Sequence, residues 1–256
     1  MIPGIERNNV LNLCIPVPPL EEQHRIVAKI EEILPYIDQY DRAYTKLETF
    51  NKKFPEDMKK SILQMAMQGK LVEQRPEEGT ADELYEQIVA EKTQLIKDGK
   101  IKKEKLLPEI TEDEIPFEIP SSWKWVKVGN IASVQSSKRV FEKDYVSHGI
   151  PFFRSKEIGD LSRGQKIRTE LFITEEHYNK LTEEYGVPKK GDILITSVGT
   201  IGNTWICDDR KFYYKDGNIT QIISSDLFSS AYIEMFLHSP LFKEQAFSTV
   251  TGTAYS

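Results

Sequence analysis

The sequence has 256 residues, of which 39% are hydrophobic and 29% charged, and its formal net charge is −6. This length forms one to two domains with a core that needs no disulfide or metal, and the composition excludes a disordered chain. No apolar run approaches the ~18 residues of a transmembrane helix, and the polar start at 1–4 is no signal peptide, so we expect a cytoplasmic protein with no membrane contact. The charge is uneven, since residues 1–120 carry a net −7 and residues 138–168 a net +4. This asymmetry predicts two parts with different partners.

A long helix is predicted from Leu20 to Phe54. Its apolar residues recur at alternating steps of four and three, which is typical of the narrow seam of a coiled coil: Ile26, Ile30, Ile33, Ile37, Tyr40, Tyr44 and Leu47. At 1.5 Å per residue this helix would be ~52 Å long, with a kink at Pro35. So narrow an apolar face requires another helix to cover it.

Two further helices are predicted before residue 100. One begins at Pro55, as a first-turn proline, and ends at Gly69, and the sequence leaves open whether it continues the first helix or folds back. The other begins with a capping box of Thr80 and Glu83 and ends at Gly99. The lysine- and proline-rich segment 100–120 is predicted to be a linker.

Beyond Ser121 the sequence changes to short β-branched and aromatic runs separated by glycine turns. We predict strands joined by loops rather than by regular helices, with one late helix near Ser230–Leu237. The predicted strands are Trp123–Val128, Ile150–Phe153, Asp192–Ser197, Asn203–Cys207 and Asn218–Ile223. The predicted fold class is therefore α+β, a long coiled-coil-forming helical spacer followed by a mixed, mainly β domain.

Two segments of this second half could bind a ligand. The stretch Gly191–Asn203 leads a buried strand into a glycine turn with hydroxyl and amide side chains, which suits a close approach to phosphate oxygens, although an ordinary tight hairpin explains it as well. The basic run from Lys138 to Arg168 alternates with aromatic residues and suits a duplex-binding face. A solvated surface over core aromatics is the alternative.

Sequence features of an enzyme are absent. No phosphate-binding loop, nuclease metal motif or cofactor-binding glycine motif occurs, and Val17–Leu20 only superficially resembles an amino-methyltransferase motif. The two cysteines, Cys14 and Cys207, predict neither a disulfide nor a zinc site, and we expect both to be buried apolar side chains. No catalytic residue, metal ligand or bound cofactor is therefore predicted.

Several segments together resemble the specificity (S) subunit of type I restriction-modification systems. The run Ile15–Val27 resembles that family's junction between the end of a target-recognition domain and a long helix, and Ser61–Leu71 resembles the far end of the helical region. The entry to the next recognition domain is matched by Pro116–Trp125, and its body by Ile150–Ile158, Gly191–Asn203 and Phe236–Phe242.

The resemblance implies a non-catalytic DNA-binding subunit that reads one half of a bipartite site in double-stranded DNA. It further implies modification (methyltransferase) subunits docked on the helical spacer and a restriction subunit in the same complex, with S-adenosylmethionine, ATP and magnesium on those partners. The implied domains are a terminal piece of a recognition domain (1–19), the helical spacer (20–99), a linker (100–120) and a recognition-domain body (121–256).

The match covers about half of an S subunit, cut out of phase. If the helix is one rod, ~50 Å separates the front piece from the body, and an antiparallel homodimer packed along the seam would exchange front pieces. A chain that bends back near Pro55, or a fragment that pairs with another S polypeptide, are the alternatives. The recognised sequence, the spacer length and the modified base cannot be read from the chain.

For DNA contact we predict hydroxyl, amide and basic residues near the glycine turns. Lysines there would neutralise phosphates, and an arginine or amide could read a base edge. These residues are Ser137, Lys138, Arg154, Lys156, Arg163, Lys166, Ser197, Thr200 and Asn203. A structural coiled-coil adaptor that reads no DNA remains the alternative function.

Overall fold

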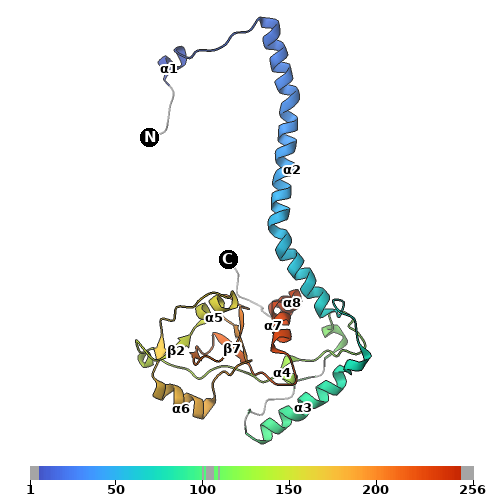
Figure 1. The fold of residues 1–256 in the computed structure, drawn as a ribbon, viewed down its shortest axis with the longest axis vertical. Coiled ribbons are helices and arrows are strands. Elements are labelled where there is room, and N and C mark those ends of the chain that lie inside the picture. Colours follow the sequence, from blue (N-terminus) through green and yellow to red (C-terminus); the bar gives the residue numbers. More distant parts are fainter. Residues whose placement is uncertain (1–5, 100, 102–106, 109, 249–256) are drawn as a thin grey trace. The chain divides into compact units, whose positions relative to one another are not determined.

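The computed structural model describes residues 6–99, 101, 107–108 and 110–248 (Figure 1). The chain divides into two compact units, Met1–Met58 and Lys59–Ser256. The predicted domain bounds 1–19, 20–99, 100–120 and 121–256 stay predictions. Within the described ranges, no helix is both long enough and apolar enough to cross a bilayer.

The first unit contains the short helix α1 (Arg7–Leu11) and most of α2 (Leu20–Met67). Helix α2 is continuous for 48 residues and includes both Pro35 and Pro55. A proline in a helix interior removes one backbone hydrogen bond, but the remaining bonds of a long helix persist. The predicted helix start at Pro55 is therefore wrong. The predicted second helix continues the first one and does not fold back.

The predicted seam of α2 is uncovered in the single chain. The exposed fractions of its seven residues range from 43% for Ile33 to 71% for Tyr40. The rings of Tyr40 and Tyr44 stack on each other along the helix, with centroids 6.2 Å apart. Cys14 is also exposed, which corrects the expectation that both cysteines are buried, since the segment around it buries none of its side chains.

The second unit begins with the end of α2 and helix α3 (Ala81–Lys97). The predicted capping box is confirmed, since the Thr80 hydroxyl accepts the Glu83 backbone N–H and the Glu83 carboxylate accepts that of Thr80. Lys92 of α3 donates to the backbone carbonyls of Gly129 and Ala132, which ties α3 to the region of α4 (Val128–Ile131).

The predicted strand Trp123–Val128 is wrong. Residues 123–127 belong to no helix or strand, and Val128 begins α4. The aromatic residues there pack on side chains instead of pairing in a sheet, as the edge-to-face contact of Trp125 with Phe117 shows, with ring centroids 5.2 Å apart.

The remaining strands form two small sheets. An antiparallel sheet has the order β1-β7-β4-β5, and a second sheet has the order β3-β2-β6 with β2 and β6 parallel. The strands are β1 (Val134–Gln135), β2 (Ile150–Phe153), β3 (Phe172–Ile173), β4 (Ile193–Thr196), β5 (Thr204–Ile206), β6 (Tyr213–Tyr214) and β7 (Ile219–Ile222). Four of the five predicted strands are thus confirmed as β2, β4, β5 and β7, whereas β1, β3 and β6 were not predicted.

Two helices lie where only loops were predicted, between β2 and β4 along the chain. They are α5 (Ser155–Ser162) and α6 (Glu175–Tyr185), and in Figure 1 they lie on either side of β2 and β7. The start of α6 has a sequence signal that the prediction overlooked, because Thr174 accepts the backbone N–H of His177 as an N-cap. The predicted late helix is confirmed as α7 (Ser230–His238), and α8 (Pro240–Ser248) follows it.

The core of the second unit is aromatic and aliphatic. The rings of Phe153 and Phe212 stack with centroids 4.7 Å apart, beside the buried Cys207. Burial raises the pKa of the Cys207 thiol, which therefore stays protonated at neutral pH. Three 3-10 turns complete the described elements: Pro76–Glu78, Glu112–Glu114 and Glu142–Asp144.

Candidate nucleic-acid interface

One edge of the four-stranded sheet gathers loops that lie far apart in the sequence. Strands β1 and β4 end at this edge, and β5 and β7 begin there, as their antiparallel registers require. The Ser197 backbone N–H donates to the carbonyl of Asn218 over 2.8 Å, and the Gly217 N–H donates to Ser136 Oγ over 3.2 Å. The loops after β1, after β4 and before β7 are therefore joined.

The parallel strands β2 and β6 bring two more segments to the same edge. The Lys215 N–H donates to the carbonyl of Phe153 over 2.9 Å, and Ser155 Oγ lies 3.4 Å from the carbonyl oxygen of Val198. The start of α5 thereby contacts the loop after β4. We call the resulting surface the loop rim; it comprises residues 136–139, 154–156, 197–203 and 215–218.

The glycine turn of the loop rim connects β4 and β5 as a β-hairpin whose seven-residue loop, 197–203, is longer than a tight turn. Gly199 and Gly202 have φ values of 84° and 86°, a region that other residues rarely adopt. Thr196 Oγ1 donates to the carbonyl of Thr200 and accepts the N–H of Asn203 over 3.1 Å, which closes the loop internally. The loop therefore presents a defined shape, with the apolar side chains of Val198 and Ile201 exposed.

Further along α5, Gly159 lies against the same hairpin. Two polar side chains lie beside this glycine: a Cβ at residue 159 would be 3.1 Å from Asn203 Nδ2 and 3.6 Å from Arg163 Nη1. Arg163 also pairs with Asp160 over 2.7 Å. Two predicted DNA contacts, an amide and a guanidinium, are thus adjacent.

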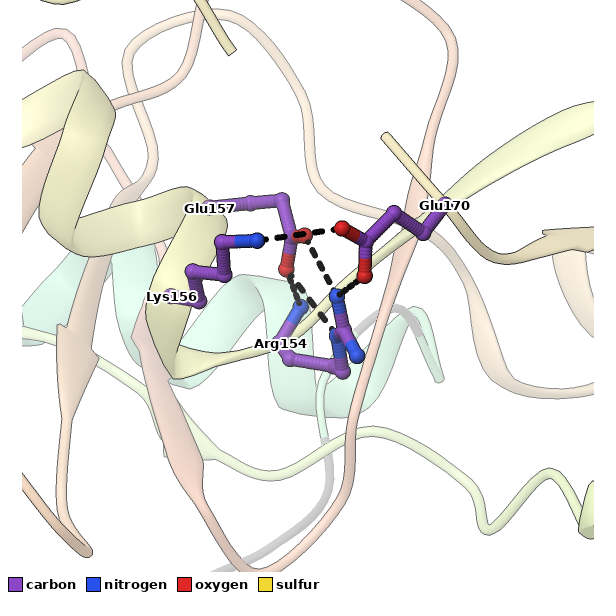
Figure 2. A network of polar contacts seen from close by, with 4 residues as sticks. All are labelled: Arg154, Lys156, Glu157 and Glu170. Carbon is purple, nitrogen blue, oxygen red and sulfur yellow. Dashed lines mark hydrogen bonds and ion pairs between the residues drawn. The ribbon is translucent and has the colours of Figure 1, made fainter. Parts of the chain in front are cut away.

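Arg154 belongs to a network of ion pairs (Figure 2). The Glu157 side chain, which is 1% exposed, accepts the Arg154 backbone N–H over 2.9 Å and its guanidinium over 2.9 and 3.3 Å. Glu170 accepts from Arg154 Nη2 over 3.0 Å and from Lys156 Nζ over 3.2 Å. Hydrogen bonds, first to Glu157 and then to Glu170, raise the pKa of Arg154, and those from Arg154 and Lys156 lower the pKa of Glu170.

The other predicted residues differ in whether their polar groups already bind a partner within the protein. Ser137 Oγ donates to the carbonyl of Tyr214 over 2.7 Å, and Ser197 Oγ lies 2.8 Å from Thr220 Oγ1, so both hydroxyls have protein partners. The Lys138 ammonium lies over the ring of Tyr185, 5.0 Å from its centroid. Lys166 is exposed on the loop after α5 and forms no ion pair with any residue that the structure describes.

The predicted site residues therefore fall into two groups. Eight lie on the loop rim or on α5 and its C-terminal end, namely Ser137, Lys138, Arg154, Lys156, Arg163, Ser197, Thr200 and Asn203, and Lys166 lies on the loop that follows α5. The acids that pair with the basic residues of this surface, Glu157 and Glu170, are not among the predicted residues. Glu157 lacks the usual sequence signal of a capping box, because the residue at the N-cap is Arg154 rather than Ser or Thr. Glu170 carries no local signal either, since its partner Arg154 is 16 residues away.

In the described ranges, His, Cys, Asp and Glu side chains form no cluster that could hold a metal ion. The buried carboxylate of Asp192 instead accepts hydrogen bonds from Lys189 N–H, from Gln221 Nε2 and from both the N–H and the hydroxyl of Ser224. These donors satisfy a buried charge, so Asp192 is a structural residue of the sheet.

Comparisons with known proteins agree on one family. Residues 120–254 match the family model described as the Type I restriction modification DNA specificity domain. The chain is 32% identical over 184 residues to the Type I restriction enzyme EcoAI specificity subunit of Escherichia coli, covering 57% of the chain and 31% of that relative. It is 33% identical over 164 residues to the EcoEI specificity subunit of the same organism, covering 50% and 28%.

The matched segments therefore span about a third of the length of these curated relatives. Among solved structures, the crystal structure of the HsdS subunit from Thermoanaerobacter tengcongensis aligns with a TM-score of 0.46 at 20% identity, over 98% of the chain and 48% of that subunit.

Proposed function

This chain belongs to the family of type I restriction-modification DNA specificity domains, and from that premise we propose that it is the non-catalytic, sequence-specific DNA-recognition part of a type I restriction-modification complex. It would read one half of a bipartite site in duplex DNA. The observation that carries the proposal is the loop rim, where separate loops joined by hydrogen bonds bring basic, hydroxyl and amide residues to one end of the four-stranded sheet.

Within this surface, the residues divide by the part of DNA that each suits. Exposed cations such as Lys166 suit phosphate contacts, which supply affinity without sequence information. Asn203 and Arg163 at the hairpin suit base edges, because an amide can pair with adenine and a guanidinium with guanine in the major groove. The exposed Val198 and Ile201 suit a thymine methyl group.

The uncovered seam of α2 supports pairing with a second specificity chain. Two helices packed antiparallel along Ile26, Ile30, Ile33 and Ile37 would bury these side chains in a homodimer, and pairing with a different S polypeptide would serve equally. In a two-fold dimer the front segment 1–19 would complete the partner's recognition domain, and the two half-sites would be identical and inverted.

The same proposal extends to the other partners and to the compartment. Modification subunits would dock on the helical spacer, and a restriction subunit would join through the complex. S-adenosylmethionine, ATP and magnesium would act on those subunits, and the complex would operate in the cytoplasm, where its DNA is.

A structural coiled-coil adaptor that reads no DNA is the second candidate. It is favoured by the exposed seam together with the ion pairs that occupy Arg139, Arg154 and Arg163 within the chain. Such an adaptor would need the helix for assembly and would leave the loop rim without a ligand.

Co-assembly with the modification subunit of its own system distinguishes the two. The purified complex is incubated with a library of random duplexes, and bound duplexes are sequenced over successive rounds. DNA recognition predicts enrichment of one defined half-site that depends on this chain. A complex that forms but enriches no sequence would support the adaptor instead.

A further inference from the structure

Glu170 places one carboxylate oxygen on each of two cations. Its Oε2 lies 3.0 Å from Arg154 Nη2, and its Oε1 lies 3.2 Å from Lys156 Nζ (Figure 2). A phosphodiester has two non-bridging oxygens that can occupy the same two positions. The free protein therefore displays an oxyanion site, filled by its own side chain.

The arginine of this site is held independently of Glu170. Glu157 is buried and binds Arg154 through both the guanidinium and the backbone N–H. Because these bonds remain when Glu170 moves away, the guanidinium keeps its position at the start of α5. Arg154 is thus preorganised for a second oxyanion.

Glu170 itself is loosely held. Its side chain is 53% exposed, and that of Lys156 is 59% exposed. Ion pairs at this exposure add little net stability, because water and salt screen them. A phosphodiester carries the same single negative charge as the carboxylate that it would replace.

We propose that Arg154 and Lys156 form a phosphate-binding site that Glu170 covers in the free protein and that a backbone phosphate of duplex DNA takes over on binding. This inference rests on the proposed function and assigns Arg154 and Lys156 to the DNA backbone rather than to a base. Glu170 then acts as an internal competitor, which weakens contact with every sequence alike.

The test measures binding of a fluorescein-labelled random-sequence duplex by anisotropy, from 50 to 200 mM NaCl, with the full chain in its complex with the modification subunit. The variants are Glu170→Gln, Lys156→Gln and their combination. Glu175→Gln is the matched control, since Glu175 pairs with Lys211 at 3.8 Å and at similar exposure. That pair lies at the opposite edge, because Glu175 follows β3 and Lys211 precedes β6.

We expect Glu170→Gln to raise affinity about three-fold at 50 mM NaCl and Glu175→Gln to leave it unchanged. The gain should shrink in the Lys156→Gln background, because the competitor and the phosphate use the same lysine. If Glu170→Gln raises the affinity by the same factor in the Lys156→Gln background, the gain comes from general charge repulsion and the proposed exchange is wrong. The exchange is also wrong if the Glu170→Gln complex binds the duplex no more tightly than the Glu175→Gln complex. If the unsubstituted complex binds no duplex at 50 mM NaCl, the proposed DNA-recognition function itself is wrong. That result differs from failure of the exchange, in which the unsubstituted complex still binds DNA.

Discussion

Asn203 Nδ2 lies 3.1 Å from the point where a Cβ on Gly159 would stand, so the hairpin and α5 touch at a glycine. A Cβ there would lie closer to Asn203 Nδ2 than nine in ten real Cβ atoms lie to a neighbour, and Arg163 Nη1 lies 3.6 Å from the same point. The absence of a side chain at Gly159 thus allows an amide and a guanidinium to approach the same point of α5.

Gly159→Ala should therefore separate stability from recognition. Alanine favours a helix over glycine by about 1 kcal/mol, and the Asn203 amide can shift by a few tenths of an ångström, so the free energy of unfolding should stay the same or rise. The displaced amide should weaken binding to the selected half-site, while binding to a random duplex stays constant. Urea unfolding and anisotropy measure the two quantities. Equal loss on both duplexes would contradict base reading by Asn203.

Glu157→Gln should destabilise the second unit by about 2 kcal/mol. The substitution removes the buried negative charge that pairs with the Arg154 guanidinium, and it leaves one acceptor oxygen in the first turn of α5 where the carboxylate has two. Glu170→Gln serves as the control, because Glu170 binds the same arginine from an exposed position and its loss should barely change stability. Urea unfolding followed by circular dichroism checks both. Similar losses for the two variants would mean that burial of Glu157 does not hold α5.

Lys166→Ala and Asn203→Ala should affect DNA binding in different ways. Loss of a phosphate contact weakens all sequences alike and lowers the salt slope by about one, whereas loss of a base contact costs ~1–3 kcal/mol at one base pair. Anisotropy with the selected half-site and its single-base variants, at several salt concentrations, separates the two patterns. The assignment fails if both variants give the same uniform loss.

Elements that depend on a short stretch of sequence were predicted correctly. The four-three repeat predicted the apolar seam of α2, Thr80 and Glu83 predicted the start of α3, and β-branched runs predicted β4 and β7. Pro55 was misread because a first-turn proline and an interior proline have the same local sequence. Only the length of helix on both sides distinguishes them.

The parts that sequence reasoning missed depend on long-range contacts. Strand β6 has two residues, and its parallel pairing with β2 brings Lys215 to the carbonyl of Phe153, which no local pattern encodes. The basic residues were predicted as a DNA-binding set from their charge, from the aromatic residues between them and from their position near the glycine turns. Which of them are paired, such as Arg154, depends on acids that only the fold brings near.

His238 should make stability depend on pH. Its Nε2 lies 2.8 Å from Thr204 Oγ1, and burial lowers its pKa, an effect that Lys59 and Lys243 reinforce and the nearby Glu234 opposes. The unfolded chain therefore binds the proton more readily, and stability falls as the pH drops below about 6.5. Thermal melts at pH 7.5 and 5.5 should show a smaller difference for His238→Gln than for the unsubstituted chain. A difference of equal size would assign the pH effect to other groups.

The seam of α2 should decide the oligomeric state. Ile33→Asp and Ile37→Asp place a charge on a face that is exposed in the single chain, so the fold should persist. In a helix-paired dimer the same charge would be buried without a partner, which disfavours association strongly. Analytical ultracentrifugation at micromolar concentration should show a dimer for the unsubstituted chain and a monomer for both variants. Gln39→Asp adds the same charge outside the seven seam residues and should leave the dimer intact. A monomeric unsubstituted chain would contradict self-association, and pairing through the seam would then require a different S polypeptide.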